Sequence, residues 1–310
     1  MARIDAPAIA FSTAPPRIAV LMTCHNRKAL TLACLGTLRT QALFAEENLF
    51  LVDDGSTDGT GDAVRQAMPG ANVVQGDGSL FWNGGMRLAW DSAKASDVAF
   101  DFYLWLNDDV RLLPDTLDML VADADGTAPR GEPVIVAAAT LEPGTDRITY
   151  GAHRRPDRSR PLRMSLVAPQ GHPVRVDTIS GNIVLVSAAA ERLLGNMHPG
   201  FEHIYGDLDY GFRAVAKQVP VVLASRPGGT CSANSPRGSS LDEGLSRIAR
   251  LRRLWAENRK VHARDWRRFV ALHGGGNLAA LAHRAAPYLR ILLNRPNHHA
   301  TTVLLEEPHA

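Results

Sequence analysis

Two groups of acidic residues follow apolar runs that have the composition of buried strands. They are Asp53 and Asp54, after residues 48–52, and the segment 107–109, after residues 102–106. The carboxyl ends of strands in a parallel sheet face the crevice in which ligands bind. A divalent cation there can bridge Asp109 to a nucleotide diphosphate, and Asp53 or Asp54 can hydrogen-bond a base or ribose edge. These residues therefore predict a site for a nucleotide and a metal.

Each acidic group also has a simpler interpretation. Asp-Gly-Ser and Asn-Asp-Asp are common turns after strands, and this alternative stays open for each group taken alone. A calcium loop fits less well. Residues 54–59 match the opening of the EF-hand pattern, but Arg65 stands where the closing Glu is required, and the segment follows a strand rather than a helix. A calcium loop is therefore disfavoured.

The chain has 310 residues, of which 45% are apolar and 21% charged, and its formal net charge is +2. This composition is typical of a soluble globular protein with one large core or two smaller ones. Cys24, Cys34 and Cys231 form no CxxC pair and leave an odd count, which argues against a disulfide framework and fits a reducing cytoplasm. No signal peptide and no run of about 18 apolar residues is recognisable, so we expect no membrane-spanning segment.

Strands alternate with helices through the first part of the predicted fold. The predicted strands are 18–22, 49–52, 72–74 and 102–106, and the predicted helices are 28–38, 61–67 and 85–95. Alternation at this spacing indicates βαβ units, and therefore an α/β fold with a mostly parallel sheet. Residues 1–16, which include three prolines, predict a flexible arm before the fold.

The second part has longer connections, which are more often functional than idle. Its predicted strands are 134–139, 147–150, 174–179, 183–186 and 219–224, and its predicted helices are 114–123 and 207–216. Pro114 is expected to open the first of these helices at its first turn. After residue 224 the sequence predicts helices up to residue 293, with an interruption near 274–276.

Several motifs occur in the order that is known from one enzyme family. They are Thr23-Cys24-His25-Asn26-Arg27 and the segments 52–59, 107–109, 78–86, 180–182 and 203–211. With them the chain resembles the family 2 inverting glycosyltransferases, over about residues 17–235. The last three segments are most similar to the bacterial branch of rhamnosyl- and galactofuranosyltransferases. The resemblance implies a GT-A fold, which is a Rossmann-like, mostly parallel sheet flanked by helices. We expect an arm at 1–16, a GT-A domain at 17–238 and a C-terminal helical extension at 239–310.

The resemblance also implies which residues bind the donor, a nucleotide-diphosphate sugar. The residues expected to hold the nucleotide are Thr23, Arg27, Asp53, Asp54 and, near the ribose, Asp108. Asp109 is expected to ligate Mg or Mn, which are hard cations suited to oxygen ligands. The family often has Asp where this chain has Asn107, and a His that commonly supplies a third ligand is missing. Cys231 or Asn234 is an alternative ligand, although we expect Cys231 to be a buried structural residue.

Trp82, Asn83 and Arg87 are further candidates for binding the donor. Trp82 and Asn83 are expected in a loop before a helix that begins near Gly85. There the backbone N–H groups and the helix dipole can meet phosphate, and Arg87 can add a cation. A core position for Trp82 stays open as the alternative. The pair Gly76-x-Gly78 lacks the third glycine of a dinucleotide fingerprint, which disfavours a dehydrogenase.

Asp207 corresponds, by the resemblance, to the catalytic base of the family. Inversion requires a carboxylate that takes the proton from an acceptor hydroxyl while this oxygen attacks the anomeric carbon opposite the leaving diphosphate. The alternative is that Asp207 only caps the helix that follows. The residues expected to contact the acceptor are Gly181, Asn182, Tyr205 and Asp209, and support of Asp207 is a second role open to Asp209.

Basic residues are concentrated in two segments. Residues 153–163 hold five Arg and one Asp in a predicted loop, and residues 241–270 hold eight Arg and one Lys against four acids. In the second segment, apolar residues recur at helical spacing and predict an amphipathic basic helix. This helix either packs on the catalytic domain or binds an anionic membrane surface, and both interpretations stay open. Nucleic acid is disfavoured as a partner because no binding module is recognisable.

The expected protein is a cytoplasmic glycosyltransferase, with a peripheral position on the inner face of the cell membrane left open. It is expected to move a sugar from a nucleotide diphosphate to a hydroxyl of a bacterial glycan or lipid-linked glycan, in a rhamnosyltransferase-like reaction. A nucleotidyltransferase is disfavoured, since no Gly-rich, Lys-containing phosphate loop follows the first strand. The alternative is a catalytically silent glycan-binding or scaffolding protein on the same fold, because of Asn107 and the missing His.

Overall fold

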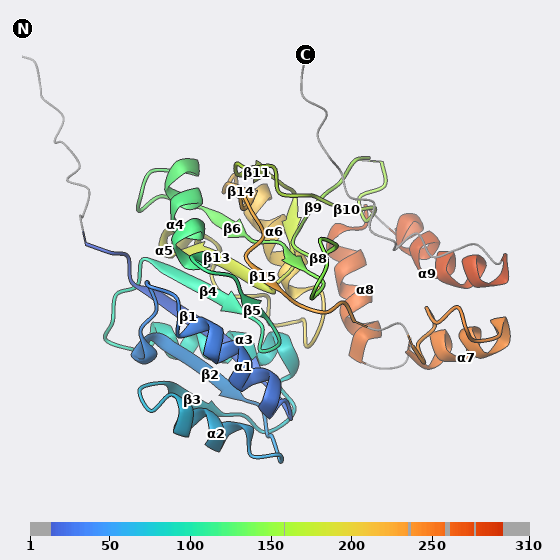
Figure 1. The fold of residues 1–310 in the computed structure, drawn as a ribbon. Coiled ribbons are helices and arrows are strands. Elements are labelled where there is room, and N and C mark those ends of the chain that lie inside the picture. Colours follow the sequence, from blue (N-terminus) through green and yellow to red (C-terminus); the bar gives the residue numbers. More distant parts are fainter. Residues whose placement is uncertain (1–13, 158, 235–236, 258–260, 276, 294–310) are drawn as a thin grey trace, which may run out of the picture.

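The computed structural model describes residues 14–293 except 158, 235–236, 258–260 and 276. Most of the predicted N-terminal arm, residues 1–16, lies outside the described residues. Figure 1 shows an α/β body, formed by the chain up to β15, and three helices, α7 to α9, that follow it.

An eight-stranded sheet forms the centre of the molecule. In spatial order its strands are β11 (Val174–Arg175), β14 (Val221–Leu223), β6 (Ile135–Ala137), β13 (Ile183–Ser187), β4 (Phe102–Leu106), β1 (Ile18–Cys24), β2 (Leu49–Asp53) and β3 (Asn72–Gln75). β1 is parallel to β2 and β4, and β2 is parallel to β3, whereas β13 is antiparallel to β4 and β6. Cys24 lies beside Asp53, so β1 and β2 end at the same edge. The predicted α/β fold with a mostly parallel sheet is confirmed.

Helices cover both faces of this sheet. They are α1 (Lys28–Leu38), α2 (Thr60–Ala67), α3 (Phe81–Lys94), α4 (Thr116–Thr127), α5 (Ala188–Leu194) and α6 (Gly206–Ala216), with a 3₁₀ turn, η1 (Glu46–Asn48), before β2. Successive side chains of a strand point to opposite faces. In β1, Val20 packs in the cluster with α1, α2 and α4, and Leu21 packs in the cluster with α3, α5 and α6. The ring of Trp90 on α3 lies 5.6 Å from Trp105 and 5.7 Å from Tyr210, which joins α3 to β4 and α6.

The first residues of helices α3 and α4 differ from those predicted from the sequence. Helix α3 starts at Phe81 rather than near Gly85, so the residues that follow Phe81 lie in its first turn and not in a loop. Helix α4 starts at Thr116, after Asp115, so the expectation that Pro114 occupies its first turn was wrong. Phe81 and Asp115 have φ angles of 53° and 55°, a left-handed conformation that residue preferences disfavour for non-glycine residues. A prediction from residue preferences therefore gave the wrong first residue for both helices.

Two small sheets lie beside the main one. One consists of β5 (Arg111–Leu112), β15 (Gly229–Thr230), β7 (Thr140–Leu141) and β8 (Ile148–Tyr150), and the other of β10 (Ser165–Leu166), β9 (Ala152–Arg154) and β12 (Thr178–Ile179). The predicted strand 174–179 is divided, since its first part joins the main sheet as β11 and its last part pairs with β9 as β12. The basic segment 153–163, predicted as a loop, begins within β9. Strands this short carry too few residues for a periodic sequence signal.

Three helices follow the sheets: α7 (Arg247–Glu257), α8 (Val261–His273) and α9 (Asn277–Leu292). The predicted interruption near 274–276 is confirmed, since α8 ends at His273 and Gly275 has a φ of 78°, as expected after a helix end. The ring of Phe269 on α8 lies 6.0 Å from that of Phe212 on α6, so α8 packs directly on the α/β body. No helix in the described part of the chain is long and apolar enough to cross a membrane.

Candidate functional site

A cavity of about 700 Å³ lies at the carboxyl ends of β1 and β4, and its walls come from segments that are far apart in the sequence. The predicted site residues that line it are Thr23, Arg27, Asp54, Trp82, Asp108, Asp109, Gly181, Asn182, Tyr205 and Asp207. The predicted site residues outside its lining are Asp53, Asn83, Arg87 and Asp209. The structure thus brings together most of the residues that the motifs indicated.

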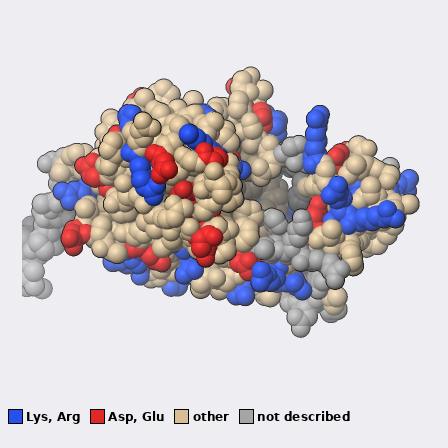
Figure 2. All heavy atoms as spheres, turned by 90° about the horizontal axis from the view of Figure 1, so that it is seen from below, with Lys and Arg blue, Asp and Glu red and all other residues tan. Residues whose placement is uncertain are grey.

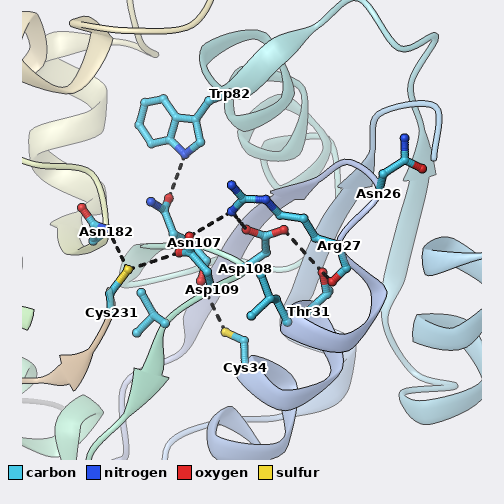
Figure 3. Close-up of polar contacts among 12 residues, drawn as sticks. Asn26, Arg27, Thr31, Cys34, Trp82, Asn107, Asp108, Asp109, Asn182 and Cys231 are labelled. Atoms are coloured by element: carbon cyan, nitrogen blue, oxygen red, sulfur yellow. Dashed lines mark hydrogen bonds and ion pairs between the residues drawn. The ribbon is translucent and has the colours of Figure 1, made fainter. Parts of the chain in front are cut away.

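Arg27 joins the two aspartates that follow β4. Its Nη1 lies 3.2 Å from Asp108 Oδ1 and 2.9 Å from Asp109 Oδ2, as Figure 3 shows. Asp108 is buried, and this burial, reinforced by the charge of Asp109 and opposed by Arg27, raises its pKa to about 6. The side chain of Asp109 is more exposed and borders the cavity. Asp109 is therefore the aspartate that is more accessible to a ligand.

Asn107 links the end of β4 to two other walls of the cavity. Its Oδ1 accepts a hydrogen bond of 2.8 Å from Trp82 Nε1, and its backbone N–H donates to the backbone oxygen of Asn182 over 3.0 Å. The thiol of Cys34 donates to the backbone oxygen of Asn107 over 3.4 Å. A neutral amide accepts from the indole without placing a further charge beside two aspartates. Asn107 thus orients Trp82 over the site (Figure 3).

The two aspartates after β2 shape the loops around the cavity. Asp53 Oδ1 accepts from the backbone N–H of Ser56 over 3.1 Å. This hydrogen bond is typical of an Asp in a turn, so it agrees with the turn interpretation of this segment. The carboxylate of Asp54 accepts from the backbone N–H groups of Gly78 over 2.8 Å and Phe81 over 3.0 Å. Asp53 therefore stabilises the turn, and Asp54, which lines the cavity, also fixes the chain that enters α3.

Asp207 lies in the first turn of α6. Its Oδ2 accepts from the backbone N–H of Gly181 over 2.8 Å, and its Oδ1 accepts from that of Leu208 over 2.8 Å. Tyr205, not Asp207, occupies the N-cap position, and no side-chain cap bond is present there. Desolvation raises the pKa of Asp207, against the effect of these hydrogen bonds. A carboxylate with a raised pKa is suited to accept a proton near neutral pH.

The sequence profile of Glycosyl transferase family 2 matches residues 19–191, which is more than half of the chain. This chain belongs to glycosyl transferase family 2. It is a glycosyltransferase, and the family assignment made from the motifs is confirmed at this level. A comparison with curated proteins found no match.

Solved structures of other glycosyltransferases resemble this glycosyltransferase along most of its length. S. aureus TarS 1-349 in complex with UDP-GlcNAc is 14% identical with a TM-score of 0.52, and the alignment covers 89% of this chain and 81% of that chain. GalNAc-T7 with UDP, GalNAc and Mn²⁺ is 13% identical with a TM-score of 0.52, and the alignment covers 92% of this chain and 57% of that chain. At these identities the similarity concerns the fold, and it confirms the predicted GT-A fold.

Two residues of α3 that were predicted to bind the donor lie outside the cavity of the glycosyltransferase. Asn83 is fully buried, and its side-chain amide donates to the backbone oxygens of His198 and Phe201. The backbone oxygen of Arg87, one turn further along α3, accepts from Asn196 Nδ2 over 3.1 Å. Because α3 begins at an earlier residue than predicted, Asn83 belongs to a packed helix rather than to a phosphate-binding loop, whereas Arg87 lies within the helix as predicted but outside the lining of the cavity.

Asp209 also lies outside the cavity. It is 1% exposed, and its carboxylate accepts from Arg213 Nε over 2.8 Å and from His273 Nε2 over 2.9 Å. Burial opposes its ionisation, but the hydrogen bonds from His273 and Arg213 outweigh this effect and lower its pKa. The structure therefore places Asp209 in a link between α6 and α8, outside the lining of the cavity.

Cys231 lies next to Asp109. Its thiol donates to Asp109 Oδ1 over 3.5 Å, and its Sγ lies 3.8 Å from Asn182 Nδ2 (Figure 3). Burial, together with the charge of Asp109, raises the pKa of this thiol to about 12. Asn234 lines the same cavity.

The described residues contain no group of three or more His, Cys, Asp or Glu side chains with the spacing of metal ligands. A hard cation such as Mg²⁺ is commonly held by one or two carboxylates together with substrate phosphates and water. The accessible carboxylate of Asp109 fits such a site, because it borders the cavity and carries a formal charge. The donor set thus suits a metal that is bound together with its substrate.

Two further residues of the cavity, Tyr150 and His153, were indicated by no motif. The Nε2 of His153 lies 3.0 Å from Ser180 Oγ, and burial lowers the pKa of His153 to about 4, so its imidazole is neutral at pH 7. Tyr150 Oη accepts from the backbone N–H of Asn234 over 3.0 Å. Tyr150 belongs to β8, which was predicted as a strand, and His153 belongs to β9, whose partners β10 and β12 come later in the chain. A strand pattern does not show that a side chain faces the cavity.

Proposed function

We propose that this glycosyltransferase transfers a sugar from a nucleotide diphosphate, with inversion, to a hydroxyl of a bacterial glycan or lipid-linked glycan. The observation that carries the proposal is that one cavity contains two carboxylates suited to different tasks. The side chain of Asp109 is accessible to a cation, and the carboxylate of Asp207 has a raised pKa. Inverting transfer needs charge compensation at the leaving diphosphate and a base at the acceptor. The similarity of the motifs to one bacterial branch favours a rhamnosyltransferase-like reaction.

The nucleotide of the donor fits the part of the cavity that is lined by Thr23, Arg27, Asp54 and Asp108. We assign Asp109 to a divalent cation, Mg²⁺ or Mn²⁺, which when bound compensates the charge of the diphosphate. A guanidinium group forms paired hydrogen bonds with phosphate oxygens, which suits Arg27 to the same group. The TarS and GalNAc-T7 structures contain UDP-GlcNAc and UDP with Mn²⁺, which supports a nucleotide-sugar donor on this fold.

Asp207 is assigned as the general base. Its carboxylate removes the proton from the acceptor hydroxyl as that oxygen forms a bond to the anomeric carbon of the donor sugar. The bond between the anomeric carbon and the diphosphate oxygen breaks in the same step, and its electron pair leaves with the diphosphate. Attack from the side opposite the leaving group inverts the configuration at this carbon. The N–H of Gly181 keeps one oxygen of the base in place, and the other faces the N–H of Leu208.

The acceptor is assigned to the wall formed by Gly181, Asn182 and Tyr205, together with Trp82, which was predicted to bind the donor but packs on Gly181. This wall combines aromatic surface with a few polar groups, which is the usual composition of a site that binds a small molecule in one orientation. Asp207 lines the same cavity and binds the N–H of Gly181 in this wall, so an acceptor hydroxyl bound there would lie within reach of the base. The roles of Asp53 and Asn83 become supporting ones, since both bind backbone groups of loops around the cavity.

The C-terminal helices expose apolar side chains among basic ones. Ile248 and Trp255 on α7 are 65% and 58% exposed, and Leu281, Leu289 and Leu292 on α9 are 63%, 53% and 54% exposed. Figure 2 shows Lys and Arg side chains on this lobe, at the right of the view. Amphipathic basic helices bind anionic membrane surfaces, where apolar side chains insert and arginines meet headgroups. We assign α7 and α9 to the cytoplasmic face of the membrane, where a lipid-linked acceptor is accessible.

Calorimetric titration with UDP, GDP and dTDP, each with and without MnCl₂, tests the donor assignment and needs no acceptor. Binding of one nucleotide that Mn²⁺ strengthens would support the transferase mechanism and identify the class of donor. A catalytically silent binding or scaffolding protein predicts neither metal-dependent nucleotide binding nor donor hydrolysis, so either result excludes it. Failure to bind any of the three nucleotides would contradict the proposed function.

A further inference from the structure

The chain that leads into α6 is held on one side by Asn83 of α3. The Nδ2 of Asn83 donates to the backbone oxygens of His198 over 3.2 Å and of Phe201 over 2.8 Å, and its backbone N–H donates to Glu202 O over 3.1 Å. The side chain is fully buried, so water does not compete for these hydrogen bonds. Asn83 therefore binds the carbonyl groups of this segment.

Asp265 of α8 holds the same segment from another side, through its N–H groups. Asp265 Oδ1 accepts from Glu202 N over 3.1 Å, and Oδ2 accepts from His203 N over 2.8 Å and Ile204 N over 3.0 Å. The residue is 0% exposed. Hydrogen bonds from backbone N–H groups to a carboxylate are charge-assisted, and removal of the carboxylate would leave up to three donors without their acceptor. Three consecutive residues are thus fixed by one side chain.

Aromatic residues of α8 pack against the next residue of the segment. The ring of Tyr205 stacks on that of Phe269, with centroids 4.8 Å apart and an interplanar angle of 17°, and lies 5.6 Å from Trp266. Tyr205 has a φ of 68°, a conformation that is unfavourable for a non-glycine residue and persists where the surroundings fix it. Helix α8 supplies a large part of these surroundings.

The segment held in this way forms one wall of the active-site cavity. His203, Ile204 and Tyr205 line the cavity, as does Asp207 shortly after them. Gly206 lies between, and a Cβ atom there would be 1.9 Å from Asn83 Oδ1. The backbone next to Asp207 is therefore packed tightly against Asn83, and a displacement of the preceding residues would be passed to the base.

We propose that Asp265 is a positioning residue for sugar transfer: by binding the N–H groups of 202–204, it fixes the cavity wall formed by residues 203–205 and the orientation of Asp207. This role rests on the proposed function of Asp207 as the base. Residue 265 lies beyond the segment 19–191 that the family profile matches, so α8 contributes to the catalytic unit from among the C-terminal helices. A displacement of a catalytic group by 1 Å can reduce the rate by about a hundredfold.

Hydrogen exchange tests the contact without any activity. In the wild-type protein, the amides of residues 202–204 have to be protected, and exchange at the rate of an unstructured chain would overturn the proposal. In Asp265→Asn, an NH₂ group replaces one of the two acceptor oxygens. We expect exchange to accelerate at least about tenfold for the amides that donate to the replaced oxygen, which are either Glu202 or both His203 and Ile204. Exchange in β1 and β2, on the donor side, should stay unchanged.

Turnover tests the role of the contact. Hydrolysis of dTDP-rhamnose, UDP-glucose and GDP-mannose is measured with MnCl₂, and nucleotide affinity is measured by calorimetry. For Asp265→Asn we expect kcat to fall about 10- to 100-fold with nucleotide affinity within about twofold of wild type. Glu243→Gln, at an exposed carboxylate of the same C-terminal region, removes the same charge and should turn over like wild type. Wild-type kcat in Asp265→Asn would overturn the proposal.

Asp265→Glu decides the outcome if Asp265→Asn also loses nucleotide binding. Glu retains the carboxylate, so recovered nucleotide binding with a kcat between that of the Asn variant and that of wild type supports positioning. Joint loss of nucleotide binding and turnover in both variants would overturn the proposal, because Asp265 would then serve overall stability. A wild-type protein that hydrolyses none of the three donors would count against the proposed function instead, and the exchange rates would still test the contact.

Discussion

Asp207 and Gly181 are joined by a hydrogen bond in which the backbone N–H of Gly181 donates to Oδ2 of Asp207 over 2.8 Å. A Cβ atom on Gly181 would lie 2.5 Å from the ring of Trp82, so only glycine lets the indole approach this backbone. Trp82 is itself held by Asn107 at the end of β4. One short series of contacts thus connects the assigned base to the metal side of the cavity.

Asp207→Asn tests the base. The amide cannot accept the proton of the acceptor hydroxyl, so we expect turnover to fall by about 10²- to 10⁴-fold, the usual contribution of a general base. Nucleotide affinity should be unchanged, because the donor end of the cavity is intact. Donor hydrolysis and calorimetry measure the two quantities, and Asp62→Asn, at an exposed residue of α2, is the control. Equal activity of Asp207→Asn and wild type would disprove the assignment.

Gly181→Ala tests the contact with Trp82. The added Cβ would collide with the indole, and overpacking of this kind reduces the free energy of unfolding by about 1–3 kcal/mol. Chemical denaturation measures the loss, and Trp82→Phe in the same chain should restore part of it. Gly126→Ala on α4 is the matched control, since nothing lies within 4 Å of its added Cβ. Equal stability of the two alanine variants would refute a close contact.

Asp109→Ala tests the metal site. Mn²⁺ is expected to increase the nucleotide affinity of the wild type. Without this carboxylate, we expect that increase to be smaller by a factor of at least about ten, which is typical when a residue of a metal site is replaced. Turnover should fall as well. Cys231→Ser should keep metal-dependent affinity within about twofold, because Mg²⁺ and Mn²⁺ prefer oxygen ligands and the hydroxyl of Ser can still donate to Asp109 as the thiol does. Loss of metal dependence in Cys231→Ser would show that Cys231 is a ligand after all.

His153 should make stability depend on pH. Its folded-state pKa is lowered from 6.5 to about 4 by burial, so the unfolded chain takes up a proton first as the pH falls. The contribution of His153 to stability is present above pH 6.5 and is lost as the pH falls through about 4. Between these values, wild type should lose up to about 3 kcal/mol relative to His153→Gln. Denaturation at several pH values measures the difference, and His172→Gln, at an exposed histidine, is the matched control. Equal loss in wild type and His153→Gln would contradict the assignment to His153.

The exposed residues of α7 should determine binding to anionic vesicles. We expect Ile248→Ser with Trp255→Ser to reduce sedimentation with phosphatidylglycerol vesicles about tenfold, because both side chains would otherwise insert into the interface. Salt should weaken binding of the wild type, since arginines contribute through screened charges. Leu30→Ser, at an exposed leucine of α1, is the control. Wild-type binding by the double variant would exclude α7 from the membrane contact.

The sequence determined the elements and motifs that depend on neighbouring residues. The predicted helix 28–38 and strand 102–106 agree with α1 and β4 at both ends, because their apolar patterns repeat over a full element. The ordered series of motifs was enough to recognise the family by resemblance. The ends of adjacent parallel strands meet at one edge of a sheet. For the same reason, Asp54, Asp108 and Asp109 were expected to line one cavity.

Only the tertiary structure decided what the remaining polar residues bind. Asn83, predicted to meet phosphate, binds backbone oxygens more than 100 positions away, and Asp209 binds His273 on α8. Asp265 was indicated by no motif. It nevertheless binds the backbone N–H groups of His203 and Ile204, which line the cavity, and of Glu202, which precedes them. A hydrogen bond depends on which elements pack together, and a side chain's type specifies that it needs a partner but not which one it finds. Packing between distant elements therefore decides which polar residues line the cavity and which support its walls.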